Sequence, residues 1–248
     1  MRFTDIFPGP LPILGMLHLK GGSPADILEC AIRESDIMYA AGVDAVIVED
    51  YFGSADDAER VLKWLSENRR NKVYGVNILD DFPRSYEFAR RYGARFMQVD
   101  SVAGHLRPQD DTSYGEMIAG YRADGSILVL GGVRFKYQPY LSGRTLAEDL
   151  EIGRTRCDAI VVTGVGTGVA TDIQKIRGFR EILGSFPLIV GAGVTVQNAA
   201  ETLLAVDGAI VGSAFKAGGL AENEMDAAGV AAFMTAVRAL RQDMTATA

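Results

Sequence analysis

Leu-Ile-Val-Gly-Ala-Gly-Val-Thr (residues 188–195) and Asp-Gly-Ala-Ile-Val-Gly-Ser-Ala-Phe-Lys (residues 207–216) are the two stretches that decide the fold. Each is a short apolar run that stops at glycines, as a buried parallel strand does where it meets a turn. Thr195 is a suitable N-cap for a helix beginning at Val196-Gln197-Asn198. Two such units in succession are typical of the last quarter of a (β/α)8 barrel, so we expect them to contain strands seven and eight.

The same pattern continues upstream, where short apolar runs alternate with stretches of helical period. The nearly unbroken apolar character of these runs indicates burial on both faces, which a parallel sheet covered by helices provides. The predicted strands are Ile13–His18, Ala45–Asp50, Tyr74–Leu79, Phe96–Ser101, Ile127–Val133, Ala159–Gly164, Leu188–Gly193 and Ala209–Phe215.

Eight regular units within 248 residues predict one α/β domain over residues 1–248, a single (β/α)8 TIM barrel. An open, doubly wound sheet is the alternative, and the regular spacing favours closure. Ser23 and Pro24 have the residue types of an N-cap and first helical position, and residues 226–241 are predicted to form the last helix.

The strand spacings also suggest two related half-barrels. Residues 44–48 (Asp-Ala-Val-Ile-Val) and 158–162 (Asp-Ala-Ile-Val-Val) stand at equivalent positions four units apart. Duplication of a four-stranded ancestor predicts this similarity. Barrel packing common to all such units is the alternative explanation.

Composition and charge argue against several classes of binding partner and cellular location. A net charge of −7 without a Lys or Arg cluster argues against nucleic-acid binding. Cys30 and Cys157 lie far apart, both in predicted helices, which argues for a reducing compartment rather than a disulfide framework. The opening apolar run is too short to span a bilayer and lacks the features of a signal peptide. We therefore expect a cytoplasmic protein without a transmembrane segment, and a homo-oligomer is possible.

The ends of strands seven and eight predict an anion site. Glycines let a backbone approach a phosphate group closely, and free N–H groups at helix starts donate hydrogen bonds to it. The glycines could instead serve only to permit tight turns. The predicted phosphate-binding residues are Gly191, Gly193, Val194, Gly212, Ser213 and Lys216.

Polar residues close the first six predicted strands, at the end of the barrel where barrel enzymes have their active sites. A carboxylate near an amine or imidazole could remove a proton beside a carbonyl group while the cation stabilises the oxyanion, which is isomerase or lyase chemistry. The predicted catalytic residues are His18, Glu49, Asn77, Asp100, Lys136 and Thr163.

Several of these side chains have alternative roles. Lys136 could form a Schiff base or simply an ion pair, and His18 could only hydrogen-bond a neighbouring strand. His105 is predicted to be solvated in a polar loop. No cofactor is predicted, although Glu49, Asp50 and Asp100 together with His18 have the ligand types for Mg²⁺ or Mn²⁺.

The sequence resembles the BtpA/SgcQ family of photosystem I biogenesis-type proteins, within the phosphate-binding barrels. The resemblance covers nearly the whole chain, and its most specific segments are residues 15–19 (Gly-Met-Leu-His-Leu) and 211–216 (Val-Gly-Ser-Ala-Phe-Lys). It also rests on residues 42–49, 161–164 and 191–195. The resemblance implies a barrel scaffold more firmly than it implies a reaction.

This chain departs from the family pattern at three strand ends. Residues 77–82 read Asn-Ile-Leu-Asp-Asp-Phe where the family has Asn-Val-Leu-Arg-Asn-Asp. Residues 132–137 keep the family's lysine as Lys136 but lose its Asp and His, and Gln98 and Asp100 replace an Arg and an Asn. The charges expected around the ligand therefore differ from those of the family.

Two classes of function follow from these patterns. One is an enzyme acting on a sugar phosphate or nucleotide-like metabolite, and the other is a non-catalytic assembly or ligand-binding protein that keeps the barrel. A scaffold has no need for His18, Glu49, Asp100 and Lys136 at converging strand ends, so the sequence favours the enzyme.

Overall fold

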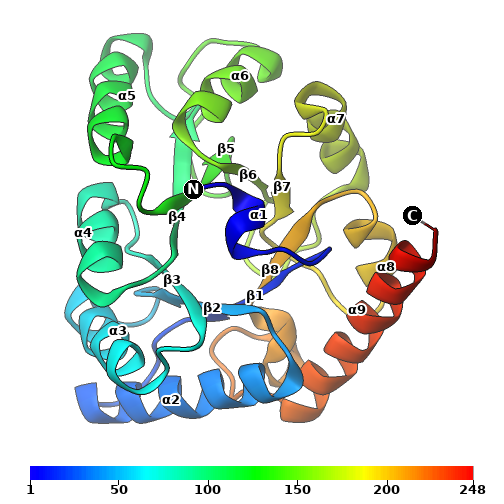
Figure 1. The fold of residues 1–248 in the computed structure, drawn as a ribbon. Helices are drawn as coiled ribbons and strands as arrows, with labels where there is room; N and C mark the ends of the chain where they lie inside the picture. Colours follow the sequence, from blue (N-terminus) through cyan, green and yellow to red (C-terminus); the bar gives the residue numbers. More distant parts are fainter. Residues whose placement is uncertain (248) are drawn as a thin grey trace.

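All eight predicted strands form and pair in parallel in chain order, and the eighth returns to the first, as a computed structural model of residues 1–247 shows (Figure 1). Closure pairs Ile13 with Ala209 and Gly15 with Val211. The sheet is therefore a closed TIM barrel, and Ala248, the last residue of the predicted domain, lies outside the described residues. The strands are β1 (Ile13–Leu17), β2 (Ala45–Glu49), β3 (Val73–Asn77), β4 (Phe96–Ala103), β5 (Leu128–Val133), β6 (Ala159–Val162), β7 (Leu188–Val190) and β8 (Gly208–Val211).

The helices surround the barrel, except the first, which lies across its centre (Figure 1). They are α1 (Phe3–Ile6), α2 (Pro24–Ala41), α3 (Ala55–Asn68), α4 (Phe82–Tyr92), α5 (Pro108–Arg122), α6 (Leu146–Arg156), α7 (Ile173–Leu183), α8 (Ala199–Leu203) and α9 (Ala227–Thr247), with the short 3-10 helices η1 (Ser213–Phe215) and η2 (Ala217–Gly219) after β8.

Six of the strands end one to four residues earlier than the sequence predicts, and β4 extends further. β7 ends at Val190 and β8 at Val211, and the residues that follow β8 form η1. The apolar runs continue past these ends because the chain remains buried as it bends over the rim. Burial therefore extends further along the chain than the hydrogen-bonded ladder.

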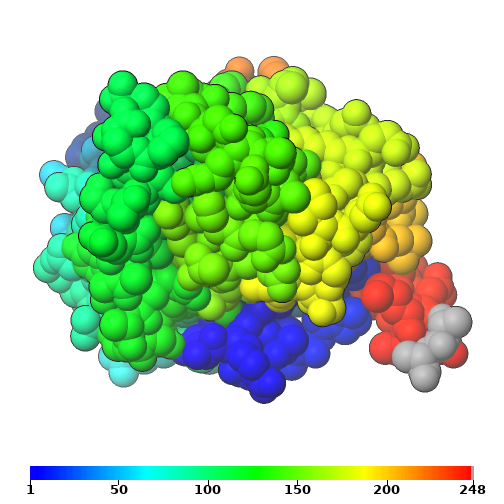
Figure 2. All heavy atoms as spheres, turned by 90° about the horizontal axis from the view of Figure 1, so that it is seen from above, coloured from blue at the N-terminus to red at the C-terminus, as the bar shows by residue number. Residues whose placement is uncertain are grey.

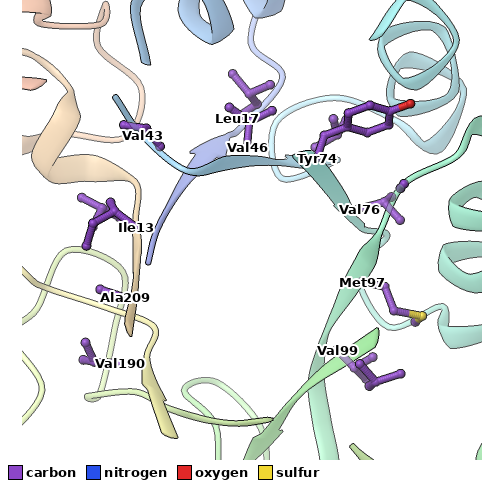
Figure 3. Packing of buried hydrophobic residues seen from close by; sticks show 14 of the residues in the cluster. Ile13, Leu17, Val43, Val46, Tyr74, Val76, Met97, Val99, Val190 and Ala209 are labelled. Carbon is purple, nitrogen blue, oxygen red and sulfur yellow. The ribbon is translucent and has the colours of Figure 1, made fainter. Parts of the chain in front are cut away.

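Side chains of the strands separate into two apolar layers. Ala45 and Ile47 of β2 belong to the cluster inside the barrel, whereas Val46 and Val48 belong to the cluster between the barrel and the helices. Figure 3 shows outer-layer side chains pointing away from the barrel axis. This alternation explains why a parallel strand buried on both faces shows no polar period.

The sequence analysis missed α1, which closes one end of the barrel. Phe3, Ile6 and Phe7 are buried in the inner cluster, and the Phe7 ring lies edge-on to Phe96 with centroids 5.7 Å apart. Figure 1 shows α1 across the centre of the barrel, and Figure 2 shows the N-terminal residues, in blue, at one edge of the molecule. The other end of the barrel is thus the open one.

Helix boundaries follow capping chemistry, with some corrections. The Ser23 hydroxyl accepts a hydrogen bond from the Asp26 amide at the start of α2, as predicted. The prediction that Thr195 is an N-cap is wrong: Asn198 is the N-cap of α8, and its side chain accepts a hydrogen bond from the Thr195 amide. Cys157 is the C-cap of α6 rather than a residue within it.

An aspartate precedes β2 and β6 and caps the start of the neighbouring strand. Asp44 accepts a hydrogen bond from the Ile13 amide, and Asp158 accepts one from the Val129 amide. Asp207, before β8, does the same for Leu188. Because the motif recurs at three strands, it fits common barrel packing as well as half-barrel duplication. In residues 1–247 no helix is long and apolar enough to cross a membrane.

Two glycines offer a test of the packing. A Cβ at Gly75 would lie 2.4 Å from the Phe96 ring, whereas one at Gly178 in α7 would meet open space. We expect Gly75→Ala to lower the free energy of unfolding by about 1–3 kcal/mol through overpacking. Gly178→Ala should raise it by about 0.5–1 kcal/mol through helix propensity. Urea denaturation measures both, and equal effects of the two changes would contradict this packing.

Candidate active site

A cavity of about 240 Å³ lies where the strands end, and it brings together eight of the twelve predicted site residues. They come from both the predicted catalytic set and the predicted anion site. The eight are His18, Glu49, Asp100, Lys136, Gly191, Gly193, Gly212 and Ser213. The other four, Asn77, Thr163, Val194 and Lys216, lie around this cavity without lining it.

Asn77 joins two carboxyl groups at the cavity wall. Its side-chain amide donates hydrogen bonds to Glu49 Oε1 at 2.8 Å and to Asp100 Oδ1 at 3.2 Å. Register explains the first contact, because Glu49 and Asn77 are direct partners at the ends of β2 and β3. Asn77 therefore holds both carboxyl groups in place without lining the cavity itself.

Burial changes the acidity of this pair. It raises the pKa of Glu49 to about 8, with the nearby Asp100 carboxylate adding to the effect and the Asn77 hydrogen bond opposing it. Burial also raises the pKa of Asp100. A carboxyl group with a pKa near 8 is protonated in most molecules at neutral pH and can act there as a general acid.

His18 lies next to Glu49 and would form an ion pair with it only if the imidazole were protonated. The Nε2 and Oε2 atoms are 3.7 Å apart. Burial, followed by the charges of Lys216 and Lys136, lowers the pKa of His18 to about 3. The imidazole is therefore neutral, and its buried Nδ1 atom has no hydrogen-bond partner among the described residues.

Lys136 provides a positive charge at the cavity. Its Nζ atom donates a hydrogen bond to Thr167 Oγ1 at 3.1 Å, and its backbone amide donates one to Thr163 Oγ1 at 2.8 Å. Thr163 is fully buried. The threonine at the end of β6 thus positions the lysine after β5 instead of facing a ligand.

Backbone amides without hydrogen-bond partners lie in two turns beside this cavity, and Gly193 and Ser213 of these turns line it. The amides of Gly193 and Val194 after β7, and of Ser213 and Ala214 after β8, have no hydrogen-bond partner within residues 1–247. The side chain of Val194 is buried in the outer apolar layer, so this residue can contribute only its backbone. The arrangement has the chemistry of an anion site.

The glycines of this site make room for protein atoms. A Cβ at Gly193 would lie 2.2 Å from the Val169 carbonyl oxygen, and φ there is +69°. A Cβ at Gly212 would lie 2.7 Å from the His18 ring. Both glycines are therefore required by the packing of the rim, whichever ligand binds, and they are poor positions for testing anion binding.

Lys216 lies outside the anion site. Its ammonium group forms a buried ion pair with Glu34 of α2. It lines a separate cavity of about 260 Å³ that also contains Cys30. Lys216 follows η1, which turns the chain after Ser213, so its side chain lies between the barrel and α2.

Other lining residues carried no sequence signal. Tyr51, Asp80, Tyr137, Gln138 and Thr167 line the cavity from the loops after β2, β3, β5 and β6. Asp80 and Tyr137 have positive φ angles of 57° and 63°. Such strain in non-glycine residues is frequent at functional sites, but only a structure reveals it.

Metal ligands do not gather in the described part of the chain. No group of three or more His, Cys, Asp or Glu side chains is placed to hold an ion there. Asp50, one of the four residues considered as ligands, instead accepts a hydrogen bond from the Leu79 amide.

Comparison with known sequences finds a matching family and relatives that cover most of the chain. The BtpA family matches residues 10–239. The chain is 28% identical to an uncharacterized protein of Thermococcus kodakarensis, covering 93% of this chain and 97% of that protein. It is 26% identical to the photosystem I biogenesis protein BtpA of Synechocystis sp., covering 96% and 91%.

Solved structures of several enzymes have a similar barrel fold. A native KDPGal structure superposes with a TM-score of 0.65 at 21% identity, covering 94% of this chain and 97% of that one. Phosphoribosyl anthranilate isomerase from Thermus thermophilus superposes with a TM-score of 0.60 at 15% identity, covering 93% and 100%. At such identities the likeness concerns the fold.

The acidity of Glu49 predicts how stability depends on pH. Between about pH 5 and pH 8 the folded chain keeps a proton on Glu49 that the unfolded chain, with an ordinary pKa of 4.5, releases. The folded state then binds more protons, so this group makes stability fall as pH rises through that window. Glu49→Gln removes the titration and should be more stable than the unchanged chain at about pH 9, by on the order of a few kcal/mol.

Urea denaturation at about pH 5 and about pH 9 measures this difference. Glu181→Gln, at an exposed position of α7, is the matched control and should behave like the unchanged chain at both pH values. A Glu49→Gln variant whose stability parallels the control would show that Glu49 titrates normally.

Proposed function

This chain belongs to the BtpA family, and we propose that it is an enzyme that transfers a proton beside a carbonyl group of a phosphorylated small molecule, in an isomerase or lyase reaction. The observation that carries the proposal is the buried Glu49–Asn77–Asp100 array, which shares a cavity with the unpartnered amides after β7 and β8. Acid–base groups at one side and anion donors at another are what such a reaction needs.

Phosphate binding is supported by the donors at the β7 and β8 turns. Four backbone N–H groups without partners can donate to phosphate oxygens, and Ser213 adds a buried hydroxyl that lines the cavity. Lys136 supplies positive charge on the same cavity. These donors hold a phosphate without help from Lys216, whose charge is neutralised by Glu34.

Proton transfer is assigned to the carboxyl groups of Glu49 and Asp100. One acts as a carboxylate base that takes the proton from the carbon beside the carbonyl, and the other acts as a protonated acid. The electron pair of the broken C–H bond moves onto the carbonyl oxygen, where the Lys136 ammonium or neutral His18 stabilises it. In an isomerisation the deprotonated carbon carries a hydroxyl group, whose proton passes through the acid to the former carbonyl oxygen, and the base returns its proton to the former carbonyl carbon, so that the carbonyl moves by one carbon. In an elimination the carbonyl forms again as a leaving group departs with its bonding electrons from the carbon on the other side of the deprotonated carbon, and the acid protonates the leaving group.

A role in assembly is the second candidate, because one relative is named a photosystem I biogenesis protein. The buried acids weigh against assembly as the sole role of this chain. Keeping the buried Glu49 close to the half-buried Asp100 opposes the ionisation of both, and a scaffold has no need for this arrangement. The enzyme neighbours in structure agree with catalysis.

Inorganic phosphate tests the anion site. We expect it to raise the melting temperature of the unchanged chain, with a stabilisation of about 2.7 kcal/mol at a hundredfold excess over Kd. Ser213→Asp places a carboxylate among the donors and should abolish the rise by repulsion. Ser185→Asp, an exposed position lining a different cavity, makes the same charge change and should leave the rise intact. A rise that survives Ser213→Asp would place the anion elsewhere.

Turnover tests the acid–base assignment. Sugar phosphates and nucleotides are screened for conversion by the unchanged chain, and kcat/KM is measured on the best substrate. Glu49→Gln and Lys136→Met should each lower kcat by about 10²–10⁴-fold, while the phosphate-induced rise in melting temperature persists. Unchanged turnover in both variants would refute the catalytic assignment, and no turnover of any phosphorylated compound would favour the assembly role.

A further inference from the structure

A second cavity of about 180 Å³ adjoins the candidate active site. It extends behind the ends of β3 and β4 toward α4 and α5. Four residues line both cavities, and these are Asp80, Gln98, Asp100 and Gln138. A ligand held at the β7 and β8 turns can therefore reach past the two acids into this space, which we call the β3–β4 cavity.

The two cavities differ in charge. Lys136 and the unpartnered amides lie on the principal cavity, whereas within residues 1–247 the β3–β4 cavity is lined by three aspartates and by no Lys or Arg. Asp81 is occupied as the N-cap of α4 and pairs with Arg84. Asp80 and Asp100 remain on the shared wall. An anionic group is therefore favoured at one end of the site and disfavoured at the other.

Buried polar atoms without partners line the β3–β4 cavity. Ser101 is 5% exposed and Gln98 is 3% exposed, and neither Ser101 Oγ nor Gln98 Oε1 has a hydrogen-bond partner among the described residues. The Gln98 amide nitrogen donates to Asp100 Oδ1 at 3.3 Å, which leaves its oxygen available to accept. Buried polar atoms normally have partners, so these atoms indicate a ligand that donates hydrogen bonds.

His105 belongs to the same cavity, which corrects the prediction that it is solvated. It is half-buried, its Nδ1 atom has no partner, and burial lowers the pKa of its imidazole. Its ring lies edge-on to Tyr114 with centroids 5.2 Å apart. With Phe82 and Met117, these rings give the cavity apolar walls suited to a flat group.

We propose that the β3–β4 cavity binds a planar, N–H-bearing head of the phosphorylated substrate, such as an amino-substituted ring. This inference rests on one part of the proposed function, the binding of the substrate's phosphate group at the β7 and β8 turns. The acceptors Gln98 Oε1 and Ser101 Oγ take hydrogen bonds from the head, and Asp80 and Asp100 favour a partial positive charge on it. A carboxylate head would meet the same aspartates and be repelled.

Three ring compounds test the head without the phosphate. Binding of 2-aminopyridine, phenol and benzoate is measured by calorimetry on the unchanged chain. The expected order places 2-aminopyridine first, phenol at least tenfold weaker and benzoate without measurable binding. Phenol binding as tightly as 2-aminopyridine would contradict a preference for N–H groups. Benzoate binding more tightly than 2-aminopyridine would overturn the proposal.

Ser101→Ala locates the binding site. It removes a hydroxyl that has no partner, so the fold should be retained, and the affinity for 2-aminopyridine should fall about threefold to tenfold. Ser35→Ala is the matched control, since Ser35 is also buried but bonds to the Ile32 carbonyl away from both cavities. Equal affinity in the two variants would place 2-aminopyridine elsewhere.

The phosphate measurement separates this proposal from the previous one. Ser101→Ala should leave the phosphate-induced rise in melting temperature unchanged, because the hydroxyl lines only the β3–β4 cavity. Binding of 2-aminopyridine without any effect of phosphate would refute the phosphate site and keep the head site. A phosphate effect without 2-aminopyridine binding would do the reverse.

Discussion

Pairing of β8 with β1 is the constraint on which the rest of the structure depends. It closes the sheet, and its register sets Gly15 beside Val211. One residue beyond that pair, Gly212 leaves the space that the His18 ring occupies. Closure thus brings His18, which follows the first strand, and Gly212 and Ser213, which follow the last, into one cavity. In an open sheet with the same strand order, β1 and β8 would lie at opposite edges.

Closure also explains the chemistry of the acids. Strands two to four end side by side, so Glu49, Asn77 and Asp100 meet at the rim. Burial there raises the pKa of both carboxyl groups, and the nearby Asp100 carboxylate adds to the effect on Glu49. The inner apolar cluster, which α1 completes at the opposite end with Phe3 and Ile6, fills the barrel.

The charge of the lining changes across the site, from the amides after β7 and β8 and Lys136 after β5 to the aspartates near β3 and β4. Two of the three departures from the family pattern fall at the acidic end, where Asp80, Gln98 and Asp100 lie, and the third falls beside Lys136.

The sequence alone determined the eight strands, the closed barrel and most of the rim residues, because burial and turn chemistry are local and repeat in every unit. It did not reveal α1, whose four residues are too short for a periodic signal, nor the direction of Lys216, which depends on η1 turning the chain toward Glu34. Likewise the pKa of Glu49 depends on Asp100 and on burial. Only the tertiary structure decided these features, because each depends on contacts between residues that are distant in sequence or on the path of the backbone.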